Sequence, residues 1–292
     1  MSYYIAYPFL YLLSLLPLSV LYLFSGLLKL LVFDIIGYRK KVVVQNLKNS
    51  FPEKSEQEIE TIANNFYQYF CEMIVEVLKG VSIGEKQLKA RCSIDQISLD
   101  LMNGYAQKGQ SVILAMAHQG NWEWAVNALS IYLKQHQTFG IYRPLHNKGF
   151  DKIVVDLRKR FRLELIPDKE VIGAMLKHNK EGFVHATVFL TDQTPSGKNM
   201  YWTNFLHQDT PVFLGIERFS KKFDYPVLFF SVKKKKRGYY SLHLETLTDT
   251  PNTYKIEGGV SELHTQAIEK SIVSQPETWL WTHRRWKRKR NL

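Results

Sequence analysis

The sequence is poor in cysteine and short of acidic residues. Its 292 residues include only two cysteines, Cys71 and Cys92, which lack the spacing of metal ligands. We therefore expect free thiols in a reducing compartment rather than a disulfide. There are 39 lysines and arginines but only 27 aspartates and glutamates, so the net charge is +12. This imbalance indicates an acidic partner, which can be nucleic acid, an anionic membrane surface or an acidic protein.

Charged residues are absent from residues 3–28, which are rich in leucine, tyrosine, phenylalanine and valine. A helix of this length can cross the hydrocarbon core of a bilayer, although Pro8 and Pro17 would bend it. The segment lacks the basic start and the cleavage site of a signal peptide. Because basic residues follow it and none precedes it, the positive-inside rule places the rest of the chain in the cytoplasm. The alternative is a hydrophobic hairpin packed on the domain.

Internal repeats and low-complexity linkers are also missing, so we expect a membrane anchor at residues 1–33 and one domain over 34–292. A capping box at 55–58 begins a helix that Gly80 ends. Beyond residue 110, strand-like apolar runs alternate with helical patterns. This alternation predicts an α/β fold with a mixed, largely parallel sheet covered by helices. Strands are expected at residues 111–117, 139–142, 163–166 and 183–190, with a hairpin of strands 225–232 and 239–247 around a basic loop at 233–238.

One expected strand leads into chemically unusual residues, because the run at 111–117 is followed by His118, Gly120, Asn121 and Glu123. Open α/β sheets place their sites at this edge, and a helix that begins at Asn121 would offer free N–H groups to an oxyanion. Across the turn Glu123 can reach His118, fix its tautomer and leave the other ring nitrogen basic. That arrangement suits removal of a proton from a hydroxyl. A merely structural histidine is the alternative, and zinc is disfavoured because no second ligand stands at the required spacing.

The block HQGNWE resembles the H-x4-D/E motif of the glycerolipid acyltransferases, in particular the lauroyl/myristoyl branch that adds secondary acyl chains to lipid A. Position 123 is more often aspartate in that family. The similarity covers nearly the whole chain, including YRKKVVVQNLKNSFPEKS, IYRPLHNKGFD, LELIPDKE, LTDQTP and QPETWLWTHRRWKRK.

The resemblance implies transfer of a fatty acyl chain from an acyl carrier protein thioester to a hydroxyl of a lipid A precursor. The reaction would take place at the cytoplasmic face of a bacterial inner membrane. His118 would be the general base and Glu123 its partner, and the chemistry needs no metal, nucleotide or other cofactor. Because the carrier protein and the phosphorylated glycolipid are both anionic, the positive charge of the chain would favour binding of both.

Four further residues are candidates for substrate binding, and Asn121 at the turn is the first of them. Arg143 ends a short expected strand, where a guanidinium can hold a phosphate or a carbonyl; an ion pair with an acid such as Asp151 is the alternative. Arg158 belongs to a basic run, for which a solvated face is the default. Asp192 follows another strand, so it either joins the site at the sheet edge or caps the next turn.

Two basic clusters remain, at residues 233–237 and 284–290, the second with Trp279, Trp281 and Trp286 within or just before it. Beside a membrane anchor they indicate contact with lipid headgroups; solubilising charge is the alternative, and the first cluster can also dock a carrier protein. Two rival functions remain open: the same chemistry on a lysophospholipid or aminolipid, and a non-catalytic basic binding protein. Nucleic acid is disfavoured because the sequence has no recognition helix or aromatic platform.

Overall fold

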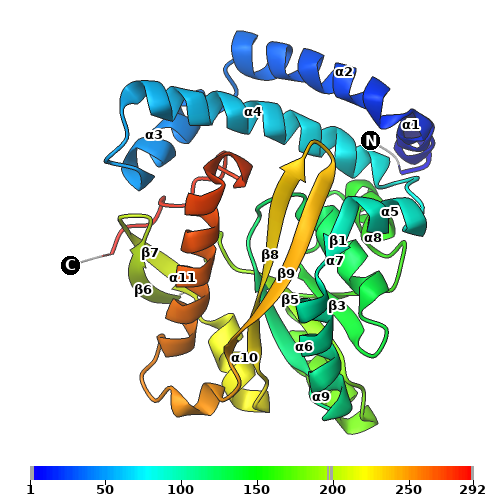
Figure 1. Ribbon diagram of the computed structural model, residues 1–292, viewed down its shortest axis with the longest axis vertical. Coiled ribbons are helices and arrows are strands. Elements are labelled where there is room, and N and C mark those ends of the chain that lie inside the picture. Colours follow the sequence, from blue (N-terminus) through cyan, green and yellow to red (C-terminus); the bar gives the residue numbers. More distant parts are fainter. Residues whose placement is uncertain (1–2, 196, 198–199, 291–292) are drawn as a thin grey trace.

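The computed structural model describes residues 3–290 except 196 and 198–199. Its centre is a seven-stranded sheet in the order β1-β9-β8-β2-β5-β3-β4, in which only the β8–β9 pair is antiparallel. The predicted α/β class, with a mixed and largely parallel sheet covered by helices, is confirmed (Figure 1). The strands of this sheet are β1 (Cys92–Ile94), β2 (Val112–Met116), β3 (Gln137–Tyr142), β4 (Leu163–Pro167), β5 (His185–Leu190), β8 (Val227–Lys236) and β9 (Tyr239–Thr248).

The remaining strands, β6 (Met200–Phe205) and β7 (Gln208–Phe213), form a separate antiparallel pair beside the last long helix. The first four helices lie across one end of the molecule (Figure 1). The helices are α1 (Tyr3–Leu15), α2 (Leu18–Lys29), α3 (Lys40–Ser50), α4 (Glu56–Lys79), α5 (Glu85–Arg91), α6 (Gln96–Gln107), α7 (Trp122–Tyr132), α8 (Lys148–Arg158), α9 (Val171–Glu181), α10 (Gly215–Phe223) and α11 (Gly259–Ser274), with a π-helical segment η1 (Leu30–Ile35) after α2 and 3₁₀ turns η2 (Pro251–Thr253) and η3 (Pro276–Thr278) on either side of α11.

The apolar N-terminal segment is not one bent helix, because the chain breaks before Pro17 into α1 and α2. Proline has no amide to continue the hydrogen bonds of the first helix, and here it precedes the first residue of the second. Residues 18–35 form a helix of 18 residues with mean hydropathy 1.9, long and apolar enough to cross a membrane. This helix packs along α4 through buried residues such as Leu21, while Leu23 and Phe24 point outward. The segment is therefore apolar on a packed face and on an exposed one.

The central strand β2 is buried on both faces, which explains its continuous apolar run. Leu114 packs with residues of α5, α6 and α7, whereas Ile113 and Ala115 pack with residues of α9, α10 and α11. Cys71 and Cys92 are buried free thiols, as predicted. The sheet is thus held between two helical layers, and its carboxyl edge is the place where side chains can meet.

The C-terminal tryptophans were expected at lipid headgroups, but two of them lie in the core. Trp279 and Trp281 are at most 1% exposed, and the side chain of Arg285 is equally buried. Arg285 donates to the Pro211 carbonyl of β7, and burial lowers the pKa of its guanidinium to about 10. This segment therefore stabilises the fold, and the headgroup prediction is wrong for these three residues.

The basic run at 233–237 also differs from expectation, because residues 233–236 continue strand β8 instead of forming a loop. Alternate residues of the strand point to opposite sides, so Lys234 faces α4 while its neighbours face away. Lys234 and Arg237 both pair with Glu72 of α4, at 3.0 and 2.7 Å. Two of the five charges therefore hold the hairpin against the helical layer.

Candidate active site

The turn after β2 has the predicted form. Gly120 adopts a φ of +58°, and a Cβ there would lie 2.6 Å from Cγ1 of Val232 and 2.9 Å from its carbonyl oxygen. Only glycine fits such a position. Asn121 caps α7 by accepting the Trp124 amide at 3.0 Å. The strand thus delivers His118 to the sheet edge and the chain turns at once into a helix.

A segment from the far end of the chain holds this turn on both sides of the histidine. The Leu280 amide donates to the His118 carbonyl at 3.2 Å, and the Gly120 amide donates to the Thr278 carbonyl at 3.0 Å. The Tyr69 hydroxyl of α4 donates to the Gly120 carbonyl at 2.7 Å. Because the backbone polar groups are paired in this way, the position of the imidazole is fixed by the fold.

The carboxylate that contacts the imidazole is Asp192. In the β2–β5 register Met116 pairs with Leu190, so two residues further on His118 lies opposite Asp192. Oδ1 of Asp192 is 2.7 Å from Nδ1 of His118, while Oδ2 accepts the His118 amide at 3.0 Å and Trp279 Nε1 at 2.7 Å. Burial would raise the pKa of the Asp192 carboxyl, but His118 and these donors outweigh it and hold the pKa below its ordinary value. The aspartate is an ionised acceptor.

Glu123, expected to be the partner of His118, pairs with Arg158 instead. Arg158 reaches from α8 and binds both carboxylate oxygens, Nε at 2.8 Å and Nη2 in a closer contact. Within the described residues no hydrogen bond joins Glu123 to His118. The guanidinium offers two parallel N–H groups to one carboxylate, whereas Nδ1 of the ring is already bound by Asp192. Burial raises the pKa of Glu123, but the charge of Arg158 and its hydrogen bonds bring it below its ordinary value.

The other two candidates have separate positions. Arg143 is largely exposed at the rim of the pocket and donates through Nε to Asp168 at 2.9 Å. Asp151, suggested as its partner, lines the pocket and accepts the amide of Leu145. Asn121 is fully buried, so it caps the helix but has no surface to offer a substrate. In this structure Asn121 is therefore seen as a helix-capping residue.

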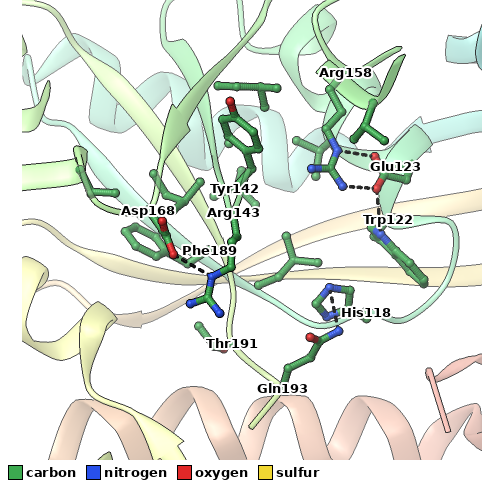
Figure 2. Close-up of a pocket in the computed structure, with 18 of the residues that line it drawn as sticks. His118, Trp122, Glu123, Tyr142, Arg143, Arg158, Asp168, Phe189, Thr191 and Gln193 are labelled. Carbon is green, nitrogen blue, oxygen red and sulfur yellow. Dashed lines mark hydrogen bonds and ion pairs between the residues drawn. The ribbon is translucent and has the colours of Figure 1, made fainter. Parts of the chain in front are cut away.

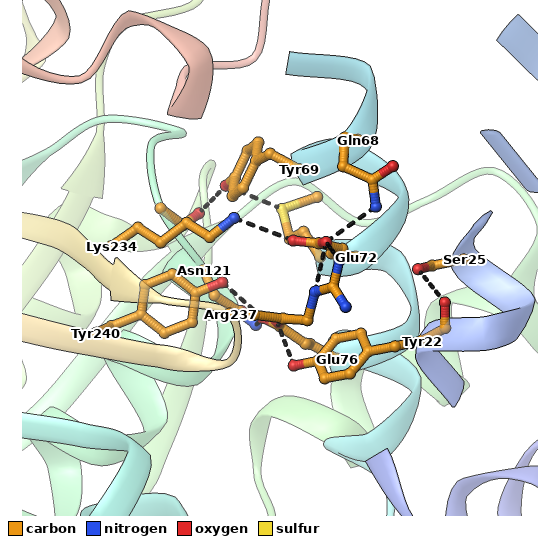
Figure 3. A network of polar contacts seen from close by, with 12 residues as sticks. Tyr22, Ser25, Gln68, Tyr69, Glu72, Glu76, Asn121, Lys234, Arg237 and Tyr240 are labelled. Carbon is orange, nitrogen blue, oxygen red and sulfur yellow. Dashed lines mark hydrogen bonds and ion pairs between the residues drawn. The ribbon is translucent and has the colours of Figure 1, made fainter. Parts of the chain in front are cut away.

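Asn121 also belongs to a buried network around Glu76 of α4 (Figure 3). The Glu76 carboxylate accepts from Asn121 Nδ2 at 2.9 Å, from the Tyr240 hydroxyl at 2.6 Å and from the Tyr22 hydroxyl at 2.9 Å. Burial nevertheless raises the pKa of Glu76. One carboxylate thus joins α2 of the apolar segment, the β8–β9 hairpin and the turn that carries His118.

A pocket of about 550 Å³ opens beside His118 (Figure 2). The rim is polar, with the Glu123–Arg158 pair, Arg143 and Gln193, whose Nε2 lies 3.4 Å from Nε2 of His118. The Trp122 ring packs against the imidazole at a centroid distance of 5.2 Å. The rest of the lining is mainly apolar and includes Val126, Val154, Leu163, Leu165, Val188, Phe189, Phe213 and Phe219.

The structure thus gathers His118, Glu123, Arg143 and Arg158 around one pocket, with Asp192 directly behind the histidine. Residue patterns did not single out Gln193, and they placed Trp279, which donates to Asp192, at lipid headgroups rather than at the site. The signals were present in the blocks LTDQTP and QPETWLW, which contain them.

A histidine backed by a buried carboxylate has its other side toward a largely apolar pocket at the edge of an α/β sheet, an arrangement that suits general-base chemistry on a lipid-like substrate. Residues 1–288 match the family model described as bacterial lipid A biosynthesis acyltransferase, and the chain belongs to this family. No curated protein matches the sequence. The chain is therefore an acyltransferase of lipid A biosynthesis, which uses an acyl donor and a lipid acceptor and comes from a membrane-associated bacterial family.

Proposed function

We propose that this protein transfers a fatty acyl chain from an acyl carrier protein thioester to a hydroxyl of a lipid A precursor, with His118 as general base. The observation that carries the proposal is the contact of 2.7 Å between Nδ1 of His118 and the buried Asp192. When Nδ1 donates its proton to this carboxylate, Nε2 keeps its lone pair and lies at the pocket.

In the reaction, His118 then takes up one proton and later returns it. Nε2 removes the proton of the acceptor hydroxyl as its oxygen bonds to the thioester carbonyl carbon. The carbon–sulfur bond breaks, and the imidazolium returns the proton to the departing thiolate. Asp192 stabilises the imidazolium and keeps the ring in one orientation, a contribution of the kind that general-base pairs make to rate.

Glu123 and Arg158, at the rim of the pocket, contribute to the same reaction. We propose that Glu123 orients Arg158, whose remaining N–H groups bind the acyl carbonyl or a phosphate of the acceptor. Arg143 supplies a second positive charge at the rim, where its side chain is largely exposed. Both arginines suit an anionic acceptor, because a guanidinium binds phosphate in a fixed geometry.

The apolar N-terminal residues 1–33 are proposed as the membrane anchor, with the catalytic domain at the cytoplasmic face of the inner membrane. Their exposed leucines and phenylalanines favour hydrocarbon over water. The net charge of +12 supports binding of an acidic carrier protein and of a phosphorylated glycolipid on the same side.

The test uses the full chain in detergent with acyl carrier proteins and a tetra-acylated lipid A precursor, and mass spectrometry of the product. His118→Ala should lower turnover by about 10²–10⁴-fold or more. His146→Ala, at an exposed histidine outside the pocket lining, is the matched control. Wild-type turnover by the His118 variant would overturn the mechanism, and acylation of a lysophospholipid in place of the lipid A precursor would overturn the acceptor.

A further inference from the structure

The break between α1 and α2 leaves backbone carbonyls that α4 and the turn after it satisfy. Nζ of Lys79 donates to the carbonyls of Ser14 at 2.8 Å and Leu16 at 3.1 Å, and the Ser82 hydroxyl donates to the Ser14 carbonyl at 2.6 Å. Lys79 is only 8% exposed, so its charge is held against these carbonyls inside the protein. Hydrocarbon offers no partner to an open helix end, so such a break is tolerated at membrane depth only where protein covers it. The two apolar helices therefore need α4 beside them.

Further along, α2 is held on α4 by polar contacts as well as by apolar packing. The Tyr22 hydroxyl donates to the buried Glu76 at 2.9 Å, and the Arg237 guanidinium lies 5.1 Å from the centre of the Tyr22 ring (Figure 3). If α2 crossed a bilayer while packed in this way, α4 would carry Glu72, Glu76 and Lys79 into the hydrocarbon, where charges are costly. If α2 crossed alone, Glu76 would lose a hydrogen-bond donor. The helix can lie along α4 or cross a membrane, and its contacts favour the first.

Helix α1 is too short to cross a bilayer by itself. Its 13 residues extend about 20 Å, against about 30 Å of hydrocarbon. It is also attached to α8, because the Tyr3 hydroxyl donates to Asp156 at 2.6 Å and Nζ of Lys152 lies 4.6 Å from the centre of the Tyr3 ring. Both ends of α1 are thus bound to the domain that carries His118.

The sides of α1 and α2 that point away from the domain are largely apolar. Helix α2 buries one stripe, which includes Leu21 and Ser25, and lies on the side of α4 away from the sheet (Figure 1). The outward apolar residues include Ile5, Phe9, Leu12, Leu23, Leu27 and Leu30. A contiguous apolar surface of this kind marks a binding face. Lys40 and Lys41 follow it, both exposed, and suit anionic headgroups. The face therefore fits a bilayer that contains anionic lipids.

We propose that α1 and α2 lie in the plane of one leaflet and bind the bilayer without crossing it, so that both ends of the chain are on the same side of the membrane. The inference rests on the proposed membrane anchor and specifies how it binds. Helix α4 then lies between the lipid and the sheet (Figure 1). Because α4 contacts the turn at His118 through Tyr69, the site is on the membrane-facing side of the sheet.

The first experiment compares the sides of the membrane on which the two chain ends lie. The full chain carries a short peptide tag with a protease site, at the N-terminus in one version and at the C-terminus in another. Protease is added to intact spheroplasts and to inside-out vesicles from the same bacteria. We expect both tags to be cut from the same side. Cleavage of the two tags from opposite sides would show that the chain crosses the bilayer, and the proposal would be wrong.

A second experiment tests the outward stripe by flotation of the purified full chain with vesicles of phosphatidylethanolamine and phosphatidylglycerol. Leu23→Lys should raise the lipid concentration for half-maximal binding by about tenfold or more, because a leucine side chain is withdrawn from lipid. Ile97→Lys is the matched control, because Ile97 is 73% exposed and Leu23 is 75% exposed, but Ile97 lies on α6. Equal effects of the two substitutions would overturn the lipid-facing assignment of α2.

Failure of the proposed acyl transfer gives a different result. A protein with both tags on one side and weaker flotation only for Leu23→Lys, but with no acyl transfer from any donor, would keep the in-plane arrangement and refute the reaction. Acyl transfer by a protein whose tags lie on opposite sides would do the reverse.

Discussion

Replacing Asp192 by asparagine tests the central contact of the site. Oδ2 of Asp192 accepts two N–H groups, from the His118 backbone and from Trp279, whereas Oδ1 accepts only from the ring. An asparagine will therefore turn its carbonyl oxygen toward the two donors and its NH₂ group toward Nδ1, because the opposite orientation would leave two buried N–H groups without acceptors. The ring must then accept at Nδ1 and carry its proton on Nε2.

That tautomer cannot take a proton from the acceptor hydroxyl. We expect kcat to fall by about 10²–10⁴-fold, equivalent to about 3–5 kcal/mol of transition-state stabilisation. The fold should be little affected, since the hydrogen bonds from the His118 amide and from Trp279 Nε1 to the side-chain oxygen persist. The variant therefore changes the charge of the pair and the tautomer of the ring, while the packing of the side chain stays the same.

The assay is acyl transfer under single-turnover conditions, with thermal unfolding of the same samples. Asp209→Asn is the control, because Asp209 is a half-exposed aspartate of β7 paired with Arg290 and lies outside the pocket lining. If Asp192→Asn turned over like the wild type, Asp192 could not be setting the tautomer of His118, and the reasoning would fail.

Three further predictions concern the frame of the site. Gly120→Ala should lower the free energy of unfolding by about 1–3 kcal/mol or more in denaturant titrations, because the added Cβ would contact Val232 and the residue has a positive φ. Gly104→Ala on α6 is the control and should not destabilise the protein. Equal stability of the two variants would contradict the expectation. A double-mutant cycle with Glu123→Gln and Arg158→Met should give a coupling energy of about 1–3 kcal/mol in unfolding, and additive effects would show that the pair does not join the helices. The pKa of Glu123 in the folded protein lies below its ordinary value of 4.5, so the stabilisation that its carboxylate provides is complete above that pH and is lost as the pH falls toward the folded value. In unfolding titrations at acid pH, Glu123→Gln should therefore reduce the fall of the free energy of unfolding with falling pH. An unchanged fall would assign this pH dependence to other carboxylates.

Local sequence patterns predicted much of the fold. The apolar runs at 111–117, 139–142, 163–166 and 183–190 all appear as strands of the central sheet. The capping box and Gly80 bound α4 as expected. Such patterns are visible because periodicity and caps act over a few residues. The strands β6 and β7 were not predicted, since their alternation is short and partly exposed.

The site was predicted only in part, because its partners are set by register. His118 and Asp192 are 74 positions apart and meet through the pairing of β2 with β5. Glu123 is closer in sequence to the histidine, so spacing favoured it, but a guanidinium from α8 takes its carboxylate. Spacing can identify a turn and its caps, whereas the choice between two nearby carboxylates depends on tertiary packing.

The turn that carries the histidine depends on residues made much later in the chain. Gln119 donates to Thr278, 159 positions away, and the same late segment binds both sides of His118. During synthesis the apolar N-terminal helices therefore emerge well before the reactive turn can assume its shape. A growing chain without residues 278–280 lacks the hydrogen bonds on both sides of His118, so the reactive turn can take its shape only after most of the chain has left the ribosome.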